Sequence, residues 1–199
     1  MFAATWLSSP DDSAWDPECD ISYPYDAVID ESDLTLVADD WLERGETVPE
    51  TPENIAEGKE ANQSSTYVGG VASRAVDGNT GGDFGNGSVT HTAEDLNAWW
   101  EVDLGSVYEI ESIEIWNRTG ATKFTQRLDD FYVFVSDVPF ESTDLMTTMA
   151  QDGVQSHRIT TAPDPSASLS VGGTGQYVRI QLTGTNYLNL AEVKVLGRQ

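Results

Sequence analysis

Closely spaced acids near the start of the chain are the first candidates for chemistry. When Asp33 is taken as the last position of a twelve-residue calcium loop, Asp30 and Asp26 fall at ligand positions. The Val28 carbonyl occupies another, and Asp20 reaches the first position once two residues are inserted. Neighbouring carboxylates repel one another unless a cation lies among them. The spacing therefore predicts a calcium site, and the alternative is that these acids only cap and solvate the helix that follows.

The overall charge limits the partners of the chain. There are 34 Asp and Glu residues against 10 Lys and Arg, which gives a formal net charge of −24, and 17 of the acids lie in residues 1–60. Such a charge repels nucleic acid and anionic membranes and favours cations. No apolar run approaches the ~18 residues that span a bilayer. We therefore expect no nucleic-acid partner and no membrane insertion.

Catalytic motifs are missing from the sequence. There is no nucleophile elbow, phosphate loop or zinc-binding pattern, and no acidic pair falls in a motif of the kind that glycosidases use. The lone Cys19 excludes an intrachain disulfide framework and a multi-cysteine zinc site. The sequence therefore predicts a binding protein and not an enzyme.

Three segments follow from the apolar pattern. In residues 34–42 the apolar positions recur at i, i+3, i+4, i+7 and i+8, which predicts one face of a short helix. Residues 45–53 are polar and contain two prolines, as is typical of a linker. We therefore divide the chain into a small helical segment (1–44), a linker (45–53) and a larger domain (54–199).

The larger domain reads as β structure. Apolar and polar residues alternate at period two in 99–104, 106–116, 129–137, 156–161, 176–183 and 190–196. Gly, Asn, Asp or Pro separates these runs, as expected between short antiparallel strands. The pattern predicts a mainly β protein, an antiparallel β-sandwich or jelly roll.

Motifs in both parts resemble known families. Residues 1–44 resemble about one and a half of the two calcium-binding repeats of a dockerin. Residues 54–197 resemble an F-type (fucose-binding) lectin domain, a branch of the discoidin-like galactose-binding folds. The matching blocks are NIA and SSTY (54–67), AVDGNTGGDFGNGSVTH (75–91), AWWEVDLG (98–105), IEIWNR (113–118), RLDDFYVFVSD (127–137) and LAEVKVLG (190–197).

The lectin resemblance implies one structural calcium ion. Its ligands would be the carbonyls of Arg74, Asn79, Ser88 and Ala191 with the carboxylates of Asp77 and Glu192. Hard oxygens from distant parts of the chain, with glycine allowing a sharp bend, suit calcium. An ordinary Asp-Gly turn is the alternative.

The same resemblance implies a sugar site formed by His91, Arg118 and Arg127. Phe84 stands where the family places an aromatic residue, and Phe124 would replace the apolar platform of an adjacent cysteine pair that this chain lacks. A second departure is Gly120, where the family has an Asp. The alternative is that both arginines form ion pairs with Asp129 and Asp130.

These features together predict a calcium-containing module that binds fucose-containing glycans. Residues 1–9 lack the features of a signal peptide, so secretion, and attachment to a larger protein, are expectations from the resemblance alone. Two alternatives stay open at this point. One is a galactose-type or other glycan binder on the same fold, and the other is a discoidin-like domain that adheres to protein or lipid. A protein partner for residues 1–44 is not defined by the sequence.

Overall fold

The structure is a computed structural model that describes residues 51–199 and Thr35. The chain divides into two units, residues 1–50 and residues 51–199. The dockerin-like segment and its predicted ligands Asp20, Asp26, Val28, Asp30 and Asp33 lie outside the described residues. Calcium binding there stays a prediction.

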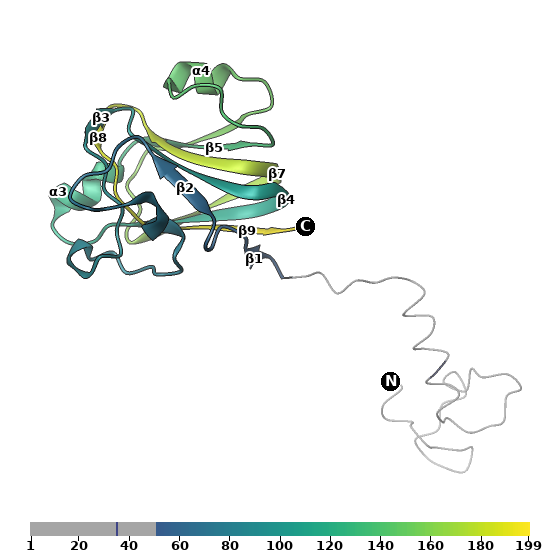
Figure 1. The fold of residues 1–199 in the computed structure, drawn as a ribbon, viewed down its shortest axis with the longest axis horizontal. Coiled ribbons are helices and arrows are strands. Elements are labelled where there is room, and N and C mark those ends of the chain that lie inside the picture. Colours follow the sequence, from purple (N-terminus) through teal and green to yellow (C-terminus); the bar gives the residue numbers. More distant parts are fainter. Residues whose placement is uncertain (1–34, 36–50) are drawn as a thin grey trace, which may run out of the picture. The chain divides into compact units, whose positions relative to one another are not determined.

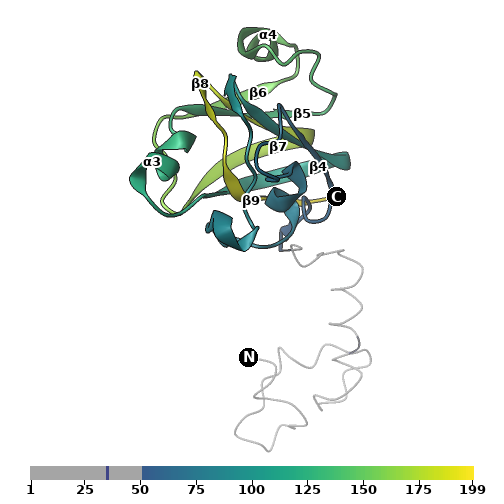
Figure 2. The ribbon, with the colours of Figure 1, turned by 60° about the vertical axis from the view of Figure 1, so that its left-hand side comes forward.

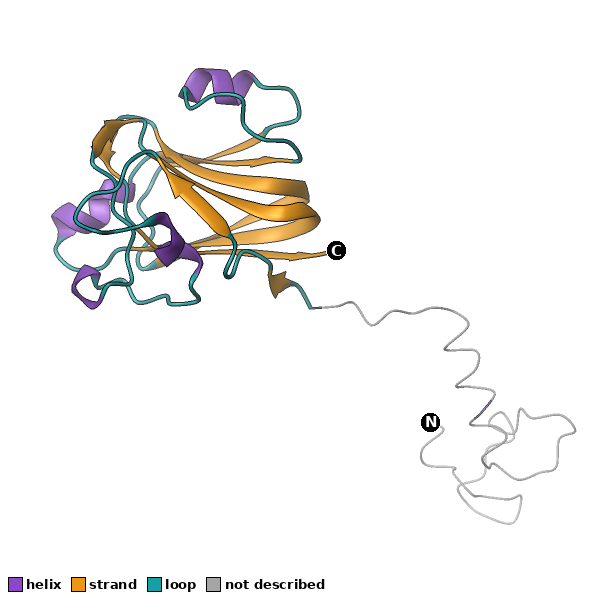
Figure 3. Ribbon diagram, viewed as in Figure 1, coloured by secondary structure: helices purple, strands orange, loops and turns teal. Residues whose placement is uncertain are grey.

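Strands dominate residues 51–199, with short helices at their periphery (Figures 1 and 3). The strands are β1 (Glu53–Asn54), β2 (Glu60–Gln63), β3 (Glu94–Leu96), β4 (Trp99–Asn117), β5 (Phe131–Ser136), β6 (Gln155–Ile159), β7 (Ser166–Leu182), β8 (Thr185–Tyr187) and β9 (Leu190–Arg198). The helices are α3 (Thr122–Thr125) and α4 (Leu145–Ala150), with 3-10 turns η2 (Ala72–Val76), η3 (Phe84–Asn86) and η4 (Gln126–Leu128). The predicted antiparallel β fold is confirmed.

Two long strands, β4 and β7, build both layers of the sandwich. The first half of β4 (99–103) pairs with the last half of β7 (177–181). This pair lies between β2, which pairs with β4, and β5, which pairs with β7 and in turn with β6. The remaining halves continue beside β9 and β1. All these pairings are antiparallel, and β3 with β8 forms a separate two-stranded sheet.

The residues of β4 that are buried in the core show where this strand changes register. Trp100, Val102 and Leu104 are fully buried, and so are Ile113 and Ile115, so the inward positions change from even to odd numbers. The pairing shows a register shift between Ile110 and Ser112, where an extra residue reverses the faces that alternate along a strand. The two runs predicted at 99–104 and 106–116 belong to one bent strand, β4.

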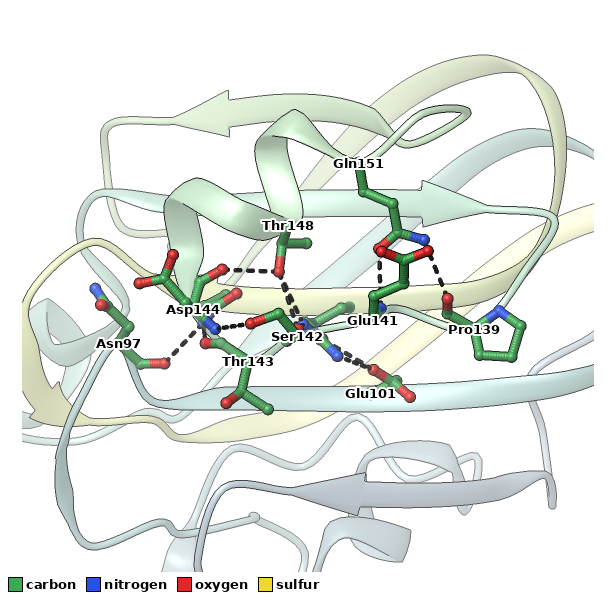
Figure 4. A network of polar contacts seen from close by, with 11 residues as sticks. Asn97, Glu101, Pro139, Glu141, Ser142, Thr143, Asp144, Thr148 and Gln151 are labelled. Carbon is green, nitrogen blue, oxygen red and sulfur yellow. Dashed lines mark hydrogen bonds and ion pairs between the residues drawn. The ribbon is translucent and has the colours of Figure 1, made fainter.

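Residues 137–154, which include α4, cover the outer face of one layer (Figure 4). Along β7, Val178 and Ile180 point into the core, so Arg179 and Gln181 point to the opposite face. Both are nonetheless buried, because Gln181 donates to the Thr143 carbonyl and Arg179 to the Ser142 carbonyl of this covering segment.

The loops that follow the strands gather at the end of the sandwich away from the C-terminus, where α3 lies (Figures 1 and 2). Helix α3 (Thr122–Thr125) places Phe124 of the predicted sugar site at this end. Within the described part of the chain, no helix has the length and apolar character needed to cross a membrane.

Candidate functional site

The loop that carries Arg118 and Arg127 is tied to the end of β4. Asn117, the last residue of β4, is buried, and its Nδ2 donates to the Thr125 carbonyl and to the Pro163 carbonyl, both at 2.9 Å. Leu128 at the end of η4 is fully buried in the core. These two anchors fix both ends of the loop and thereby bring the two arginines to one place.

His91 reaches the same place from a different part of the chain. Its Nδ1 lies 2.7 Å from the Thr92 carbonyl, which can only accept, so Nδ1 carries the proton and Nε2 keeps its lone pair. Arg127 Nη1 donates to this Nε2 at 3.2 Å and to Asn189 Oδ1 at 3.1 Å. Burial, together with the charges of Arg127 and Arg118, lowers the pKa of His91 despite the opposing Thr92 carbonyl. The imidazole is therefore neutral at pH 7.

Gly70 allows the loop before η2 to lie directly against His91. His91 N donates to the Gly70 carbonyl at 2.9 Å. A Cβ atom at residue 70 would lie 2.5 Å from His91 N and 2.6 Å from His91 Cβ. No side chain fits at residue 70 without displacing the imidazole, so this glycine fixes how closely the loop approaches the candidate site.

Aromatic rings hold both guanidinium groups. Arg118 Cζ lies 4.8 Å from the Phe84 ring centroid and 4.1 Å from that of Phe124. Arg127 Cζ lies 5.0 Å from the Phe124 centroid and 4.3 Å from that of Tyr187. Each cation thus contacts two ring faces, and Phe124 is shared between them. Such contacts contribute roughly 0.5–2 kcal/mol each, depending on exposure.

The alternative that these arginines pair with Asp129 and Asp130 is wrong. Asp130 instead forms a bidentate pair with Arg158 and accepts from the Thr183 hydroxyl. Within residues 51–199, neither Arg118 nor Arg127 has a carboxylate oxygen within the 4.0 Å of an ion pair. Arg118 Nε is also buried without a hydrogen-bond partner. The donors of this cluster are thus largely unused by the protein itself.

A second predicted cluster surrounds Glu192. Its side chain is fully buried, Oε1 accepts from Gly78 N at 3.1 Å, and Oε2 has no hydrogen-bond partner in the described structure. Burial is the main reason why the pKa of Glu192 rises to about 7, and the nearby charge of Asp77 adds to it. An isolated buried carboxylate is unfavourable. This orphaned oxygen beside a second acid fits a site for a cation.

The remaining predicted calcium ligands lie around the same loop. η2, which contains Arg74, packs against β9, which contains Ala191 and Glu192. Asn79 Oδ1 accepts from Gly81 N at 2.9 Å, and the Ser88 hydroxyl donates to the Gly81 carbonyl. Within residues 51–199 no three His, Cys, Asp or Glu side chains form a metal-binding group. A cation here would therefore depend on backbone carbonyls as well as on the two carboxylates.

Known proteins resemble both this fold and its sequence. A family described as "NedA-like, galactose-binding domain" matches residues 74–180. Fucolectin-5 of Anguilla japonica is 31% identical over 156 residues, which cover 73% of this chain and 76% of that protein. A fucose-binding module of Streptococcus pneumoniae is 38% identical with a TM-score of 0.62, covering 73% of this chain and 98% of that one. The lectin domain of lectinolysin, solved with the Lewis B antigen, is 36% identical with a TM-score of 0.62, covering 72% and 96%.

The chain belongs to this galactose-binding-like F5/F8 type C family. Its relatives there include fucolectins and fucose-binding modules, so the named relatives are carbohydrate-binding proteins. Gly120 stands where the family resemblance implies an Asp. Its φ of +117° is one that L side chains rarely adopt, so the backbone here suits glycine. An Asp could not simply be restored at this position of the family's loop.

Sequence reasoning missed three residues of the candidate site. Tyr187 packs on Arg127 and lies edge-on to His91, with 5.4 Å between the ring centroids. The ring centroid of Tyr67 lies 5.3 Å from that of His91. Asn189 accepts a hydrogen bond from Arg127. Asn189 is itself held by donating to the Thr90 carbonyl at 3.0 Å. The pairing of β8 with β3 joins segments about ninety residues apart. No local pattern in the sequence signals that contact.

Proposed function

We propose that this chain is a non-catalytic carbohydrate-binding module that recognises fucose-containing glycans through His91, Arg118 and Arg127. The observation that carries the proposal is that both guanidinium groups are fixed in place while no carboxylate of residues 51–199 pairs with them. Their remaining N–H groups are free to bind a ligand. The fucolectins and fucose-binding modules among the relatives support fucose as that ligand.

The chemistry of the cluster suits the hydroxyl groups of a sugar. Water satisfies each sugar hydroxyl in solution, so affinity depends on donors that are already fixed and charge-assisted. The planar guanidinium forks supply several donors at set angles. Phe84, which lies edge-on to His91 at 5.4 Å, offers the apolar contact that the methyl group of fucose needs.

We further propose that the fold holds one calcium ion at Glu192 and Asp77. The carbonyls of Arg74, Asn79, Ser88 and Ala191 would supply the other ligands, as oxygen-rich calcium sites require. The unpartnered Glu192 Oε2 supports this assignment. The ion would supply a positive charge that lets the buried Glu192 carboxylate ionise where it lies. It would stabilise the base of the loop between η2 and η3, which carries Phe84.

The family resemblance supports a role outside the cell, where fucosylated glycans are displayed. We propose that the chain is the glycan-binding appendage of a larger secreted protein. The unit of residues 51–199 would then direct that protein to its glycan, and the ligand would be bound without chemical change.

Calorimetric titration with a methyl fucoside tests the proposed sugar site. The expected affinity is weak, with a Kd between roughly millimolar and tens of micromolar, or about −4 to −6 kcal/mol. Arg118→Ala and Arg127→Ala should each cost about 1.5–3 kcal/mol of binding, because they remove charge-assisted hydrogen bonds. Arg198→Ala is the matched control, since Arg198 is engaged with Glu109 at an exposed surface. Full affinity in both site variants would show that the site lies elsewhere.

A further inference from the structure

We propose that the glycan bound here carries an anionic substituent, a sulfate ester or a carboxylate, that docks on Arg118 and Lys123 beside Phe124. This inference rests on the proposed function. It adds an anionic substituent to the fucose-containing glycan proposed above. It starts from the distribution of positive charge over the molecule.

Positive charge is concentrated around one ring. Phe124 contacts Arg118 and Arg127 as described, and Lys123 Nζ lies 5.0 Å from the same centroid. Residues 51–199 contain nine Lys and Arg residues, so a third of them meet at this ring on a chain with a net charge of −24. Like charges so close repel one another, and the pKa of Arg118 is lowered first by burial and then by the charge of Arg127. An arrangement of this kind is unfavourable until an opposite charge arrives.

The protein itself does not supply that opposite charge at contact distance. In the described part of the chain, no carboxylate lies within ion-pair distance of Arg118, Lys123 or Arg127. Asp83 acts on Arg118 and Glu94 acts on Arg127 only through space. The other arginine–acid pairs of this domain show that acids are available where the fold uses them.

Arg118 is the cation with the most binding capacity left. It packs against the rings of Phe84 and Phe124 and has no polar partner among residues 51–199. Its Nε is enclosed by the protein, so the terminal Nη groups are the donors left for a ligand. A neutral hydroxyl would satisfy one donor and leave the charge uncompensated. An oxyanion accepts two parallel N–H bonds from a guanidinium fork and cancels its charge as well. The geometry at Arg118 therefore favours an oxyanion over a hydroxyl.

Binding of an anion by so acidic a chain has to be local. Beyond about 8–10 Å in physiological salt the remaining charges are screened, so the cluster acts on groups that reach it directly. A charged substituent on the bound fucose, or on its neighbouring sugar, meets that condition. A uniformly charged polyanion such as nucleic acid would instead meet a chain with a net charge of −24.

The test compares matched ligands by calorimetry on the full chain. The ligands are methyl fucoside, its monosulfated forms, and a fucosylated glycan that carries a carboxylate, each at low salt and at 0.5 M NaCl. We expect at least one anionic ligand to bind tenfold or more tightly than the neutral fucoside, with most of that preference lost at high salt. The sulfate and carboxylate arms then identify which oxyanion is preferred.

Lys123→Gln locates the anion. This variant should reduce the ratio of anionic to neutral affinity at least threefold, whereas Lys59→Gln, a control outside the cluster, should leave the ratio unchanged. Equal affinity for neutral and anionic fucosides would overturn the inference and leave the proposed function standing. A preference that Lys123→Gln does not reduce would also overturn it. If no fucoside binds, neutral or charged, the proposed function itself is wrong.

Discussion

Two regions of the sandwich use arginine in opposite ways. Arg179 is 3% exposed, and its guanidinium binds Glu101 at 2.7 Å, the Ser142 carbonyl at 2.6 Å and the Thr148 hydroxyl at 3.2 Å (Figure 4). At the other region, Arg118 has two aromatic rings and no polar partner within the described residues. Both cations lie over aromatic faces, since Arg179 also packs on Phe140 at 4.3 Å.

The two regions differ in the polar partners of the arginine, since only Arg179 binds a carboxylate and a carbonyl. They do not differ in the aromatic rings. At Arg179 every favourable partner comes from the protein, so the residue joins the sheet to the segment that covers it. At Arg118 and Arg127 the rings fix the direction of each cation but do not use its hydrogen-bond donors. A structural arginine is thus recognised by completed hydrogen bonding, and a candidate ligand-binding arginine by a fixed position with donors to spare.

Removing the guanidinium of Arg179 should have the largest effect on stability. Arg179→Met leaves Glu101 and the Ser142 carbonyl without their partner, which should cost about 3–5 kcal/mol of the free energy of unfolding. Urea titration measures it, with Arg198→Met as the control, because its exposed pair with Glu109 should contribute under about 1 kcal/mol. Equal losses in the two variants would contradict the structural role assigned to Arg179. Fucoside affinity of the folded protein should stay unchanged in both.

A smaller effect is expected at Glu192, in the protein kept free of calcium by a chelator. The folded pKa of about 7 lies above the ordinary glutamate value of 4.5, so the folded state binds the proton more tightly than the unfolded chain. The stability that Glu192 contributes is therefore fully present below pH 4.5 and is lost as the pH rises to about 7. A pKa raised from 4.5 to about 7 corresponds to about 3 kcal/mol at most.

Chemical denaturation at a series of pH values measures this loss, and Glu192→Gln should remove it. Added calcium should restore stability at pH 7, because the ionised carboxylate is then matched by the ion. Stability that is flat from pH 5 to 8 in chelator, with no response to calcium, would contradict both the burial cost and the proposed metal site.

Much of the fold could be predicted because its signals are local. The alternation of Trp100, Val102 and Leu104 defines a strand with one buried face, and the order of the lectin-like blocks gave the family. The merging of two predicted strands into β4 was missed, because Gly105, with a φ of +85°, and the register shift between Asp103 and Tyr108 interrupt the period and look like a strand end. The burial of Arg179 was missed too, since it depends on a segment that covers the sheet from outside.

The candidate site divides along the same line. The order of the lectin-like motifs predicted His91, Arg118 and Arg127 as site residues, and the structure places them in one cluster. Sequence alone left open whether the arginines pair with Asp129 and Asp130, because residue type does not show which of many acids a cation meets. Tyr187 could not have been assigned, because its place beside Arg127 follows from a long-range strand pairing.

The smallest effect tests whether the rings act in the same way in the two regions. Phe124→Leu removes the ring face on which Arg118 and Arg127 rest but keeps an apolar side chain. Without it the two like charges can move apart, and fucoside affinity should fall by about 0.5–1 kcal/mol, roughly two- to fivefold. Because Phe124 is only half-buried, the free energy of unfolding should change little. Calorimetry and urea titration on the same sample separate these two effects.

Phe140→Leu is the matched variant on the other side of the comparison. Its ring lies over Arg179 and contacts Phe134, so the loss should appear in stability and not in affinity. Arg179 keeps its hydrogen bonds to Glu101 and Ser142, so that loss should stay well below the effect of Arg179→Met. If Phe124→Leu instead destabilises the fold and spares binding, the ring is part of the scaffold. The direction of Arg118 would then be set by the backbone anchors at Asn117, which fix the loop whatever lies against the guanidinium.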